Sequence, residues 1–279
     1  MTIEKGDGMK RFWKGLACAA AATGAFLYWQ NNGLMVTQQI YKGNVPRAFH
    51  GYKILHISDL QNKKFGKKQR HLIYKTECTA PDMIVITGDL IDRNRTNLDA
   101  AMDFVDAIVD IAPVYYVSGN HEHQGGYFSE LAERLQEAGV KILDNGKSVI
   151  ERDGDRITLL GLADKSVNPY YKAALRTLKK GSGEDFTILL SHRPELFSDY
   201  VQQGVDLACC GHAHGGQIRL PFIGGIFAPH QGFFPKYTAG MYREGKTAMV
   251  VSRGLGNSTF PFRIFNRPEL VEITLFHKG

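Results

Sequence analysis

The chain has 279 residues, enough for one large domain or two small ones with a substantial core. Apolar residues make up 43% of the chain and charged residues 22%, which excludes a disordered protein. The net charge of +6 suits anionic partners, but the Lys and Arg residues form no run with interleaved aromatic residues, so no specific nucleic-acid partner is expected.

Residues 1–30 combine a cluster of cations with an apolar run. Lys10, Arg11 and Lys14 precede an uncharged stretch from Gly15 to Trp29. This order is typical of an uncleaved signal-anchor or transmembrane segment, which would hold the chain at the cell membrane with its remainder on the extracytoplasmic side. The alternative is a buried helix of the domain, because the run is shorter than the roughly 17–25 residues that span a bilayer.

Residues 31–49 are expected to form a connector into a single domain, residues 50–279. Short apolar, β-rich runs predict six buried strands: Lys53–Ser58, Asp82–Gly88, Pro113–Gly119, Ile157–Ala163, Phe186–Ser191 and Val205–Cys210. Between them, helical spacing places apolar residues on one face of two helices, around Leu98–Ile108 and Phe128–Ala138, and Pro194 is expected to open a third.

Turn signals and composition describe the rest of the domain. Asp144-Asn145-Gly146 and Asp153-Gly154 predict two consecutive hairpins, because these dipeptides supply the positive φ that such turns need. The adjacent Cys209 and Cys210 are expected to be buried thiols, and the segment Leu220–Phe265 to form irregular loops at a pocket rim. Strands interleaved with helices predict an α/β (α+β layered) fold.

Polar clusters follow five of the six predicted strands directly. The clusters are Ser58-Asp59-Leu60-Gln61, Gly88-Asp89-Leu90-Ile91-Asp92, Gly119-Asn120-His121-Glu122, Ser191-His192 and Gly211-His212-Ala213-His214. Ligand sites of α/β sheets lie beyond the carboxyl ends of the strands, so we expect these side chains to meet. Asp59 with Gln61, and His212 with His214, would point to one side if the backbone there is extended.

Carboxylate, amide and imidazole donors without thiolates suit Mn²⁺, Fe, Zn²⁺ or Co²⁺. The number of donors exceeds what one tetrahedral ion needs and fits two. Two ions about 3.5–4 Å apart can share a carboxylate and clamp an in-line phosphoryl displacement.

The ordered blocks D-x-Q, G-D-x-x-D, G-N-H-E, S-H and G-H-x-H resemble the calcineurin-like metallophosphoesterases from about Lys53 onwards. The run Gly215–Pro221 resembles a bacterial, membrane-associated phosphodiesterase branch of that family. The resemblance implies a four-layer αββα sandwich of two mixed β-sheets flanked by helices. It also implies a centre of two divalent metal ions, and hydrolysis of phosphodiester or pyrophosphate links by a metal-bridging hydroxide.

By motif position, the resemblance assigns the first ion to Asp59, Gln61, Asp89 and His214, and the second to Asp89, Asn120, His192 and His212. Two further roles follow from it: His121 would contact the phosphate and protonate the leaving oxygen, oriented by Asp92. Arg193 is a further candidate for contacting a phosphoester substrate.

Gln61 departs from the family pattern, which has His at this position. Its carbonyl oxygen would bias the first site towards oxygen-preferring ions, with Mn²⁺ the expected metal. Alternatively, Gln61 only hydrogen-bonds a metal-bound water. The rival to a membrane-anchored phosphoesterase acting on envelope or nucleotide phosphoesters is a catalytically weak phosphate- or cell-wall-binding module that retains the fold.

Overall fold

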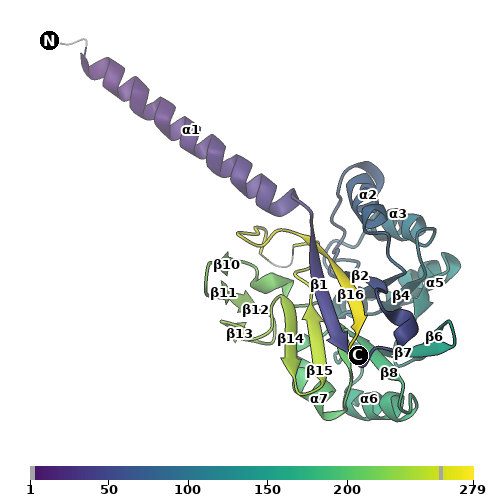
Figure 1. Cartoon of the computed structure of the whole chain (residues 1–279). Helices are drawn as coiled ribbons and strands as arrows, with labels where there is room; N and C mark the ends of the chain where they lie inside the picture. Colours follow the sequence, from purple (N-terminus) through teal and green to yellow (C-terminus); the bar gives the residue numbers. More distant parts are fainter. Residues whose placement is uncertain (1–3, 258–259) are drawn as a thin grey trace.

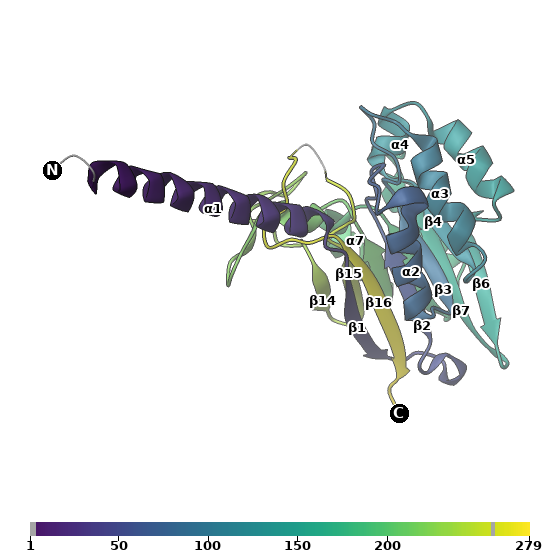
Figure 2. The ribbon, with the colours of Figure 1, turned by 90° about the horizontal axis from the view of Figure 1, so that it is seen from above.

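The computed structural model describes residues 4–257 and 260–279. Two six-stranded sheets pack face to face, and helices cover the outer face of each sheet (Figures 1 and 2). The predicted four-layer sandwich is therefore confirmed.

The first sheet has the strand order β1-β16-β2-β3-β4-β5. Neighbours run parallel except β16 and β2, which are antiparallel. In that order, the strands are Met35–Gly43, Glu269–His277, Lys53–Ile57, Met83–Thr87, Val114–Val117 and Lys141–Ile142. The helices of this half are α2 (Arg70–Thr79), α3 (Leu98–Ile108), the short α4 (Asn120–Gln124) and α5 (Phe128–Glu137).

The second sheet has the order β14-β15-β9-β8-β7-β6 and is parallel in its centre, with an antiparallel pair at each edge. In that order, the strands are Gly240–Glu244, Thr247–Val251, Leu207–Cys210, Phe186–Ser191, Asp155–Leu162 and Lys147–Arg152. Its helices are α6 (Tyr171–Lys180) and α7 (Phe197–Gln202), the latter following a 3₁₀ turn that Pro194 opens. Four two-residue strands form hairpins outside the sheets: β10 (Arg219–Leu220) with β11 (Gly224–Gly225), and β12 (Phe227–Ala228) with β13 (Gly232–Phe233).

The central strands are buried on both faces, which is why they read as continuous apolar runs. Along β2, Ile54 faces the other sheet, whereas Leu55 and Ile57 face the helices. Cys209 packs between the sheets, and Cys210 faces α7 from the outer side of β9, so the prediction of two buried thiols is confirmed.

Three expectations about the chain's organisation are wrong. Residues 31–49 are not only a connector, because β1 lies within them and pairs along its whole length with β16. The turn at Asn145-Gly146 does not close a hairpin, since β5 belongs to the first sheet and β6 to the second. The segment from Leu220 to Phe265 is not wholly irregular, because it contains β14 and β15.

The N-terminal segment is helical. Helix α1 spans Glu4–Asn32 and projects away from the sandwich, as both views show (Figures 1 and 2). Every side chain described from residue 8 to residue 25 is exposed. Of the helices in the described part of the chain, none combines the length and the apolar character that crossing a bilayer requires, which leaves the predicted transmembrane span unsupported.

Candidate metal centre

The polar clusters meet at one edge of the sandwich. Strands β2, β3 and β4 are parallel to one another, as are β8 and β9, so the loops that follow them share an edge within each sheet. The loops after β3 and β8 touch across the two sheets, where the His192 ring nitrogen Nδ1 donates to the Thr87 carbonyl at 2.7 Å. The predicted convergence of strand ends is therefore present.

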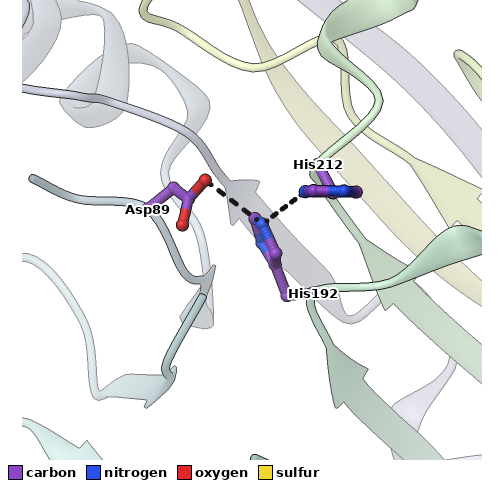
Figure 3. A group of neighbouring side chains, drawn as sticks. All are labelled: Asp89, His192 and His212. Atoms are coloured by element: carbon purple, nitrogen blue, oxygen red, sulfur yellow. Dashed lines mark hydrogen bonds and ion pairs between the residues drawn. The ribbon is translucent and has the colours of Figure 1, made fainter. Parts of the chain in front are cut away.

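Asp89 belongs to two groups of potential metal ligands. In the first group, Asp89, His192 and His212 each offer an atom within 4.8 Å of the others, and Asp59, Asp89 and His214 do the same in the second. Asp89 Oδ2 lies 3.2 Å from His192 Nε2, which lies 3.1 Å from His212 Nδ1 (Figure 3). On the other side, His214 Nε2 lies 3.4 Å from Asp59 Oδ1. One carboxylate thus connects two clusters of three donors.

The chemistry of these donors fits divalent cations. Because the Thr87 carbonyl can only accept, His192 must donate from Nδ1, which turns Nε2 towards Asp89 as a ligand atom. Burial opposes protonation of His192, but the Asp89 carboxylate outweighs it and raises the pKa of His192 to about 10. Without a cation, the ring is therefore an imidazolium that balances the Asp89 charge, and binding a cation displaces its proton.

Two amide oxygens at the same place lack partners. Among residues 4–257 and 260–279, the buried Asn120 Oδ1 and Gln61 Oε1 accept no hydrogen bond. An unpaired buried acceptor costs roughly 1–3 kcal/mol, which a cation would offset. The Gln61 amide nitrogen lies 3.2 Å from His214 Nε2 and 3.5 Å from Asp89 Oδ2. Since the two ends of an amide have the same shape, half a turn about the last side-chain bond directs the oxygen to this position. Both amides therefore fit the centre.

The backbone of the centre is left-handed, not extended as expected from the i, i+2 spacing. The φ angle is positive in five non-glycine residues of the centre: Asp59, Gln61, Asp89, His212 and His214. Such conformations cost energy for a residue with a side chain and persist where the surroundings enforce them, as at functional sites. The side chains converge because the chain turns sharply at each strand end.

Close approach explains two of the glycines next to these residues. A Cβ on Gly211 would lie 1.8 Å from Ser58 Oγ and 2.5 Å from Asp59 Oδ2. A Cβ on Gly119 would lie 2.2 Å from Asp89 Oδ1, although its extended backbone is open to any residue. These two glycines therefore make room for carboxylates, whereas Gly88 has a positive φ of 83°.

Glu122, which is not among the predicted site residues, holds two of the loops together. Its carboxylate accepts hydrogen bonds from the backbone N–H groups of Asp89, Leu90 and Gly119 at 2.6–3.1 Å. Burial, with the nearby Asp89 charge, raises the pKa of Glu122 to about 8. Its position in the G-N-H-E block indicated that Glu122 belongs to the site. The sequence could not show that Glu122 bonds to the backbone and is not a metal ligand.

His121 lies beside the centre, but Asp92 does not hold it by a hydrogen bond. The His121 ring nitrogen Nδ1 accepts a hydrogen bond from the backbone N–H of Arg93 at 3.2 Å, whereas Asp92 Oδ2 lies 4.0 Å from the same nitrogen. Asp92 instead accepts from the backbone of the next turn through Oδ1. The predicted orientation of His121 by Asp92 is thus replaced by a backbone contact, which leaves the neutral ring's proton on Nε2, 3.9 Å from Asp89 Oδ2.

Arg193 is not placed to bind a substrate as predicted. Its guanidinium is 2% exposed, and it donates to both carboxylate oxygens of Asp164, at 2.5 and 2.9 Å. The remaining nitrogen, Nη1, lies 2.8 Å from both His212 Nε2 and His230 Nδ1. Arg193 therefore supports the back of the His212 ring. Asp164 carried the same signal as the ligand residues, because it follows directly on the predicted strand Ile157–Ala163, whereas His230 had no distinguishing sequence pattern.

The chain is similar to known proteins over most of its length. The profile of the family described as calcineurin-like phosphoesterase matches residues 52–216. The chain is 33% identical over 282 residues to the metallophosphoesterase YkuE of Bacillus subtilis, covering 95% of this chain and 96% of that protein. It is 28% identical over 233 residues to the phosphodiesterase YaeI of Escherichia coli, covering 80% and 82%. Among solved structures, TT1561 of Thermus thermophilus aligns with a TM-score of 0.48 and 15% identity, over 73% of this chain and 90% of that one. Because the family profile covers more than half of the sequence, and YkuE is similar over nearly all of it, the chain belongs to the calcineurin-like phosphoesterase family.

Proposed function

We propose that the chain hydrolyses phosphodiester or pyrophosphate links with two divalent cations. Membership of the family makes it a hydrolase of phosphoesters. The observation that carries the specific proposal is Asp89, whose carboxylate belongs to both groups of ligand residues. The phosphodiesterase name of YaeI supports diesters as the substrate class.

The side chains divide into holding and proton-transferring groups. Asp59, Gln61, Asp89 and His214 would hold one cation, and Asp89, Asn120, His192 and His212 the other. When bound, the two cations polarise the phosphoryl oxygens and lower the pKa of the attacking water. His121 carries its proton on Nε2, on the side of Asp89, where it can protonate the leaving oxygen.

We propose Mn²⁺ as the metal. The group of Asp59, Asp89 and His214, with the Gln61 amide, offers oxygen atoms from two carboxylates and an amide beside a single imidazole, and oxygen donors favour Mn²⁺ over softer ions. Reconstituting metal-free protein with Mn²⁺, Fe²⁺, Zn²⁺ and Co²⁺ separately would rank their affinities and rates.

The test of the activity compares wild type with Asp89→Asn after loading with Mn²⁺. Wild type should bind about two ions per chain and hydrolyse bis-p-nitrophenyl phosphate. Asp89→Asn should lose at least about 100-fold in rate, because even residues behind a ligand cost 10–100-fold. The matched control, Asp106→Asn, alters an exposed carboxylate on α3 and should leave the rate unchanged. Folded wild type that binds no metal would favour the phosphate-binding alternative.

We also propose that α1 attaches the chain to the cell membrane, with the sandwich on the extracytoplasmic side. The support is the order of Lys10, Arg11 and Lys14 before the apolar stretch, with few cations soon after it. A reporter that is active only in the cytoplasm, fused after Gly279, should be inactive. Activity of that reporter would contradict the export of the domain.

A further inference from the structure

We propose that two aromatic loops beside the metal centre dock, together with α1, onto an anionic lipid surface and turn the centre towards that surface. The loops are residues 220–234 and 260–265, here called the aromatic rim. The proposal extends the proposed membrane attachment by giving the sandwich its own lipid contact.

The sheet topology places the base of α1 at the edge that carries the metal centre. Strand β1 runs parallel to β16, and β16 runs antiparallel to β2. The start of β1, just after α1, therefore lies at the end of β2, where Asp59 follows. Figures 1 and 2 both show the base of α1 beside the loops that precede β16.

Hydrogen bonds connect the base of α1 to a metal-centre residue. The buried Gln30 side chain in the last turn of α1 accepts from the backbone N–H of Asn266 at 3.3 Å. The Asn266 amide in turn donates to the His214 carbonyl at 2.7 Å. The rings of Phe26 on α1 and Phe265 on the rim lie 5.7 Å apart. The helix, the rim and the centre are thus held as one unit.

The rim exposes large apolar side chains that the described chain leaves uncovered. Phe222 is fully exposed, and Phe233 and Phe234 are 74% and 68% exposed. Ile223, Phe262 and Phe265 are also exposed. The two loops are neighbours, because Ile218 and Ile264 form a β-bridge and the Arg219 N–H donates to the Ile264 carbonyl at 3.0 Å. Single exposed apolar residues are common, but a group of them on neighbouring loops marks an interaction surface. Aromatic side chains in particular are enriched where proteins meet the membrane–water interface.

The charge of these segments selects an anionic surface. No Asp or Glu occurs in residues 211–240 or 252–268, which include the rim and contain five Lys or Arg residues, two in the first segment and three in the second. Of these, Arg263 is buried, Arg219, Arg253 and Arg267 are half-buried, and Lys236 is exposed. Basic segments beside inserted apolar side chains are what binds anionic head groups.

The distribution of exposed residues favours lipid over a protein groove. A groove covers one stripe of a helix, whereas the side chains of α1 are exposed on all sides from residue 8 to residue 25. The rim adds exposed aromatic side chains from two loops that the Ile218–Ile264 bridge joins. A lipid surface accommodates such scattered insertions without a complementary shape.

The test uses the full chain, mixed with vesicles of phosphatidylcholine alone or with added phosphatidylglycerol, followed by sedimentation. Binding should require phosphatidylglycerol and weaken with added salt. Phe222→Ser/Phe233→Ser should weaken the apparent vesicle affinity at least tenfold. The control, Ile40→Ser/Val149→Ser, removes exposed apolar side chains from β1 and β6 and should bind like wild type. Both double variants should hydrolyse soluble bis-p-nitrophenyl phosphate at the wild-type rate.

Two results would overturn the proposal. If the rim variant binds vesicles as tightly as wild type, α1 attaches the chain without the rim. The docking of the rim is then wrong, whereas the proposed attachment by α1 stands. If the full chain ignores the vesicles and instead self-associates through the rim, as light scattering would reveal, the occupant is a second copy. If wild type does not hydrolyse bis-p-nitrophenyl phosphate, the proposed activity is wrong. That result would not affect the docking of the rim, because vesicle binding is measured separately.

Discussion

The guanidinium of Arg193 makes a two-bond ion pair with the carboxylate of Asp164, and both side chains are buried. Burial alone would raise the pKa of Asp164, but the hydrogen bonds from Arg193 outweigh it and lower the pKa to about 2. The stability from this pair is therefore present above pH 3.8 and is lost as the pH falls towards 2. Arg193 also touches the ring nitrogen of His212 that faces away from the ligand cluster, so the pair links folding to the metal centre.

Replacing Arg193 by Met should destabilise the fold by about 3–5 kcal/mol, because it removes the ion-pair partner of the buried Asp164 carboxylate and leaves it the backbone N–H of Ser166. It should also weaken metal binding about 10–100-fold, since His212 loses a neighbour that orients it. Denaturant unfolding and metal titration measure the two effects. Arg193→Met/Asp164→Leu should recover most of the stability but not the metal affinity. Full metal affinity in a folded single variant would contradict the orienting role.

Gln61→His should tighten binding at the first site and shift its preference from Mn²⁺ towards Zn²⁺, because imidazole is a softer donor than an amide oxygen. Competition between the two ions in metal-free protein gives the preference directly. Gln69→His is a control, since Gln69 is a buried amide that bonds to the backbone of Lys63, Phe65 and Ala100 and to none of the ligand residues. If Gln61→His changes neither affinity, preference nor rate, Gln61 is not a ligand.

Gly211→Ala should displace the Asp59 carboxylate, because the new methyl group would overlap Ser58 Oγ and Asp59 Oδ2. We expect a loss of about 1–3 kcal/mol in stability from overpacking, together with loss of the first metal ion. Metal analysis should find about one ion per chain in place of two. Gly15→Ala on exposed α1, where no atom lies within 4 Å of the new methyl group, should have neither effect.

His56 should make the fold less stable in mild acid. Burial lowers the pKa of His56 to about 3, below the ordinary value of 6.5. The unfolded chain therefore takes up a proton as the pH falls below 6.5, whereas the folded chain does not until about pH 3, so stability is lost across this range. Between pH 7 and pH 5 the loss is about 2 kcal/mol. The His56→Gln variant retains a polar atom for Thr87 Oγ1. Between pH 7 and pH 5, its free energy of unfolding should fall by about 2 kcal/mol less than that of wild type. Equal losses in the two proteins would place the pKa of His56 near its ordinary value.

The sequence was most informative about the central strands and the polar clusters after them. Those strands are buried on both faces, so each one is a continuous apolar run that can be recognised in the sequence without knowledge of distant segments. Asp59, Asp89 and His212 stand out because polar residues follow directly on such runs. Helix α3 was predictable for a similar reason, since its buried residues recur at helical spacing.

Contacts between distant segments explain what the sequence did not reveal. Strand β1 pairs with β16, so that Met35 lies opposite Glu269 at the other end of the chain. Helix α6 is an exception, because Tyr171, Ala174, Leu175 and Leu178 recur at helical spacing and made it predictable from the sequence. The turn at Asn145-Gly146 is real, but the sheet that its next strand joins is decided by tertiary packing. The burial of Arg193 likewise depends on Asp164, which precedes it by 29 residues.

The proposed chemistry requires that the Asp89 carboxylate serves two metal ions. A crystal structure of Mn²⁺-loaded protein, with anomalous diffraction to locate the ions, tests it directly. We predict two peaks about 3.5–4 Å apart, with Asp89 between them, one peak beside Asp59 and His214 and the other beside His192 and His212. A single peak, or two peaks of which only one contacts Asp89, would contradict the account.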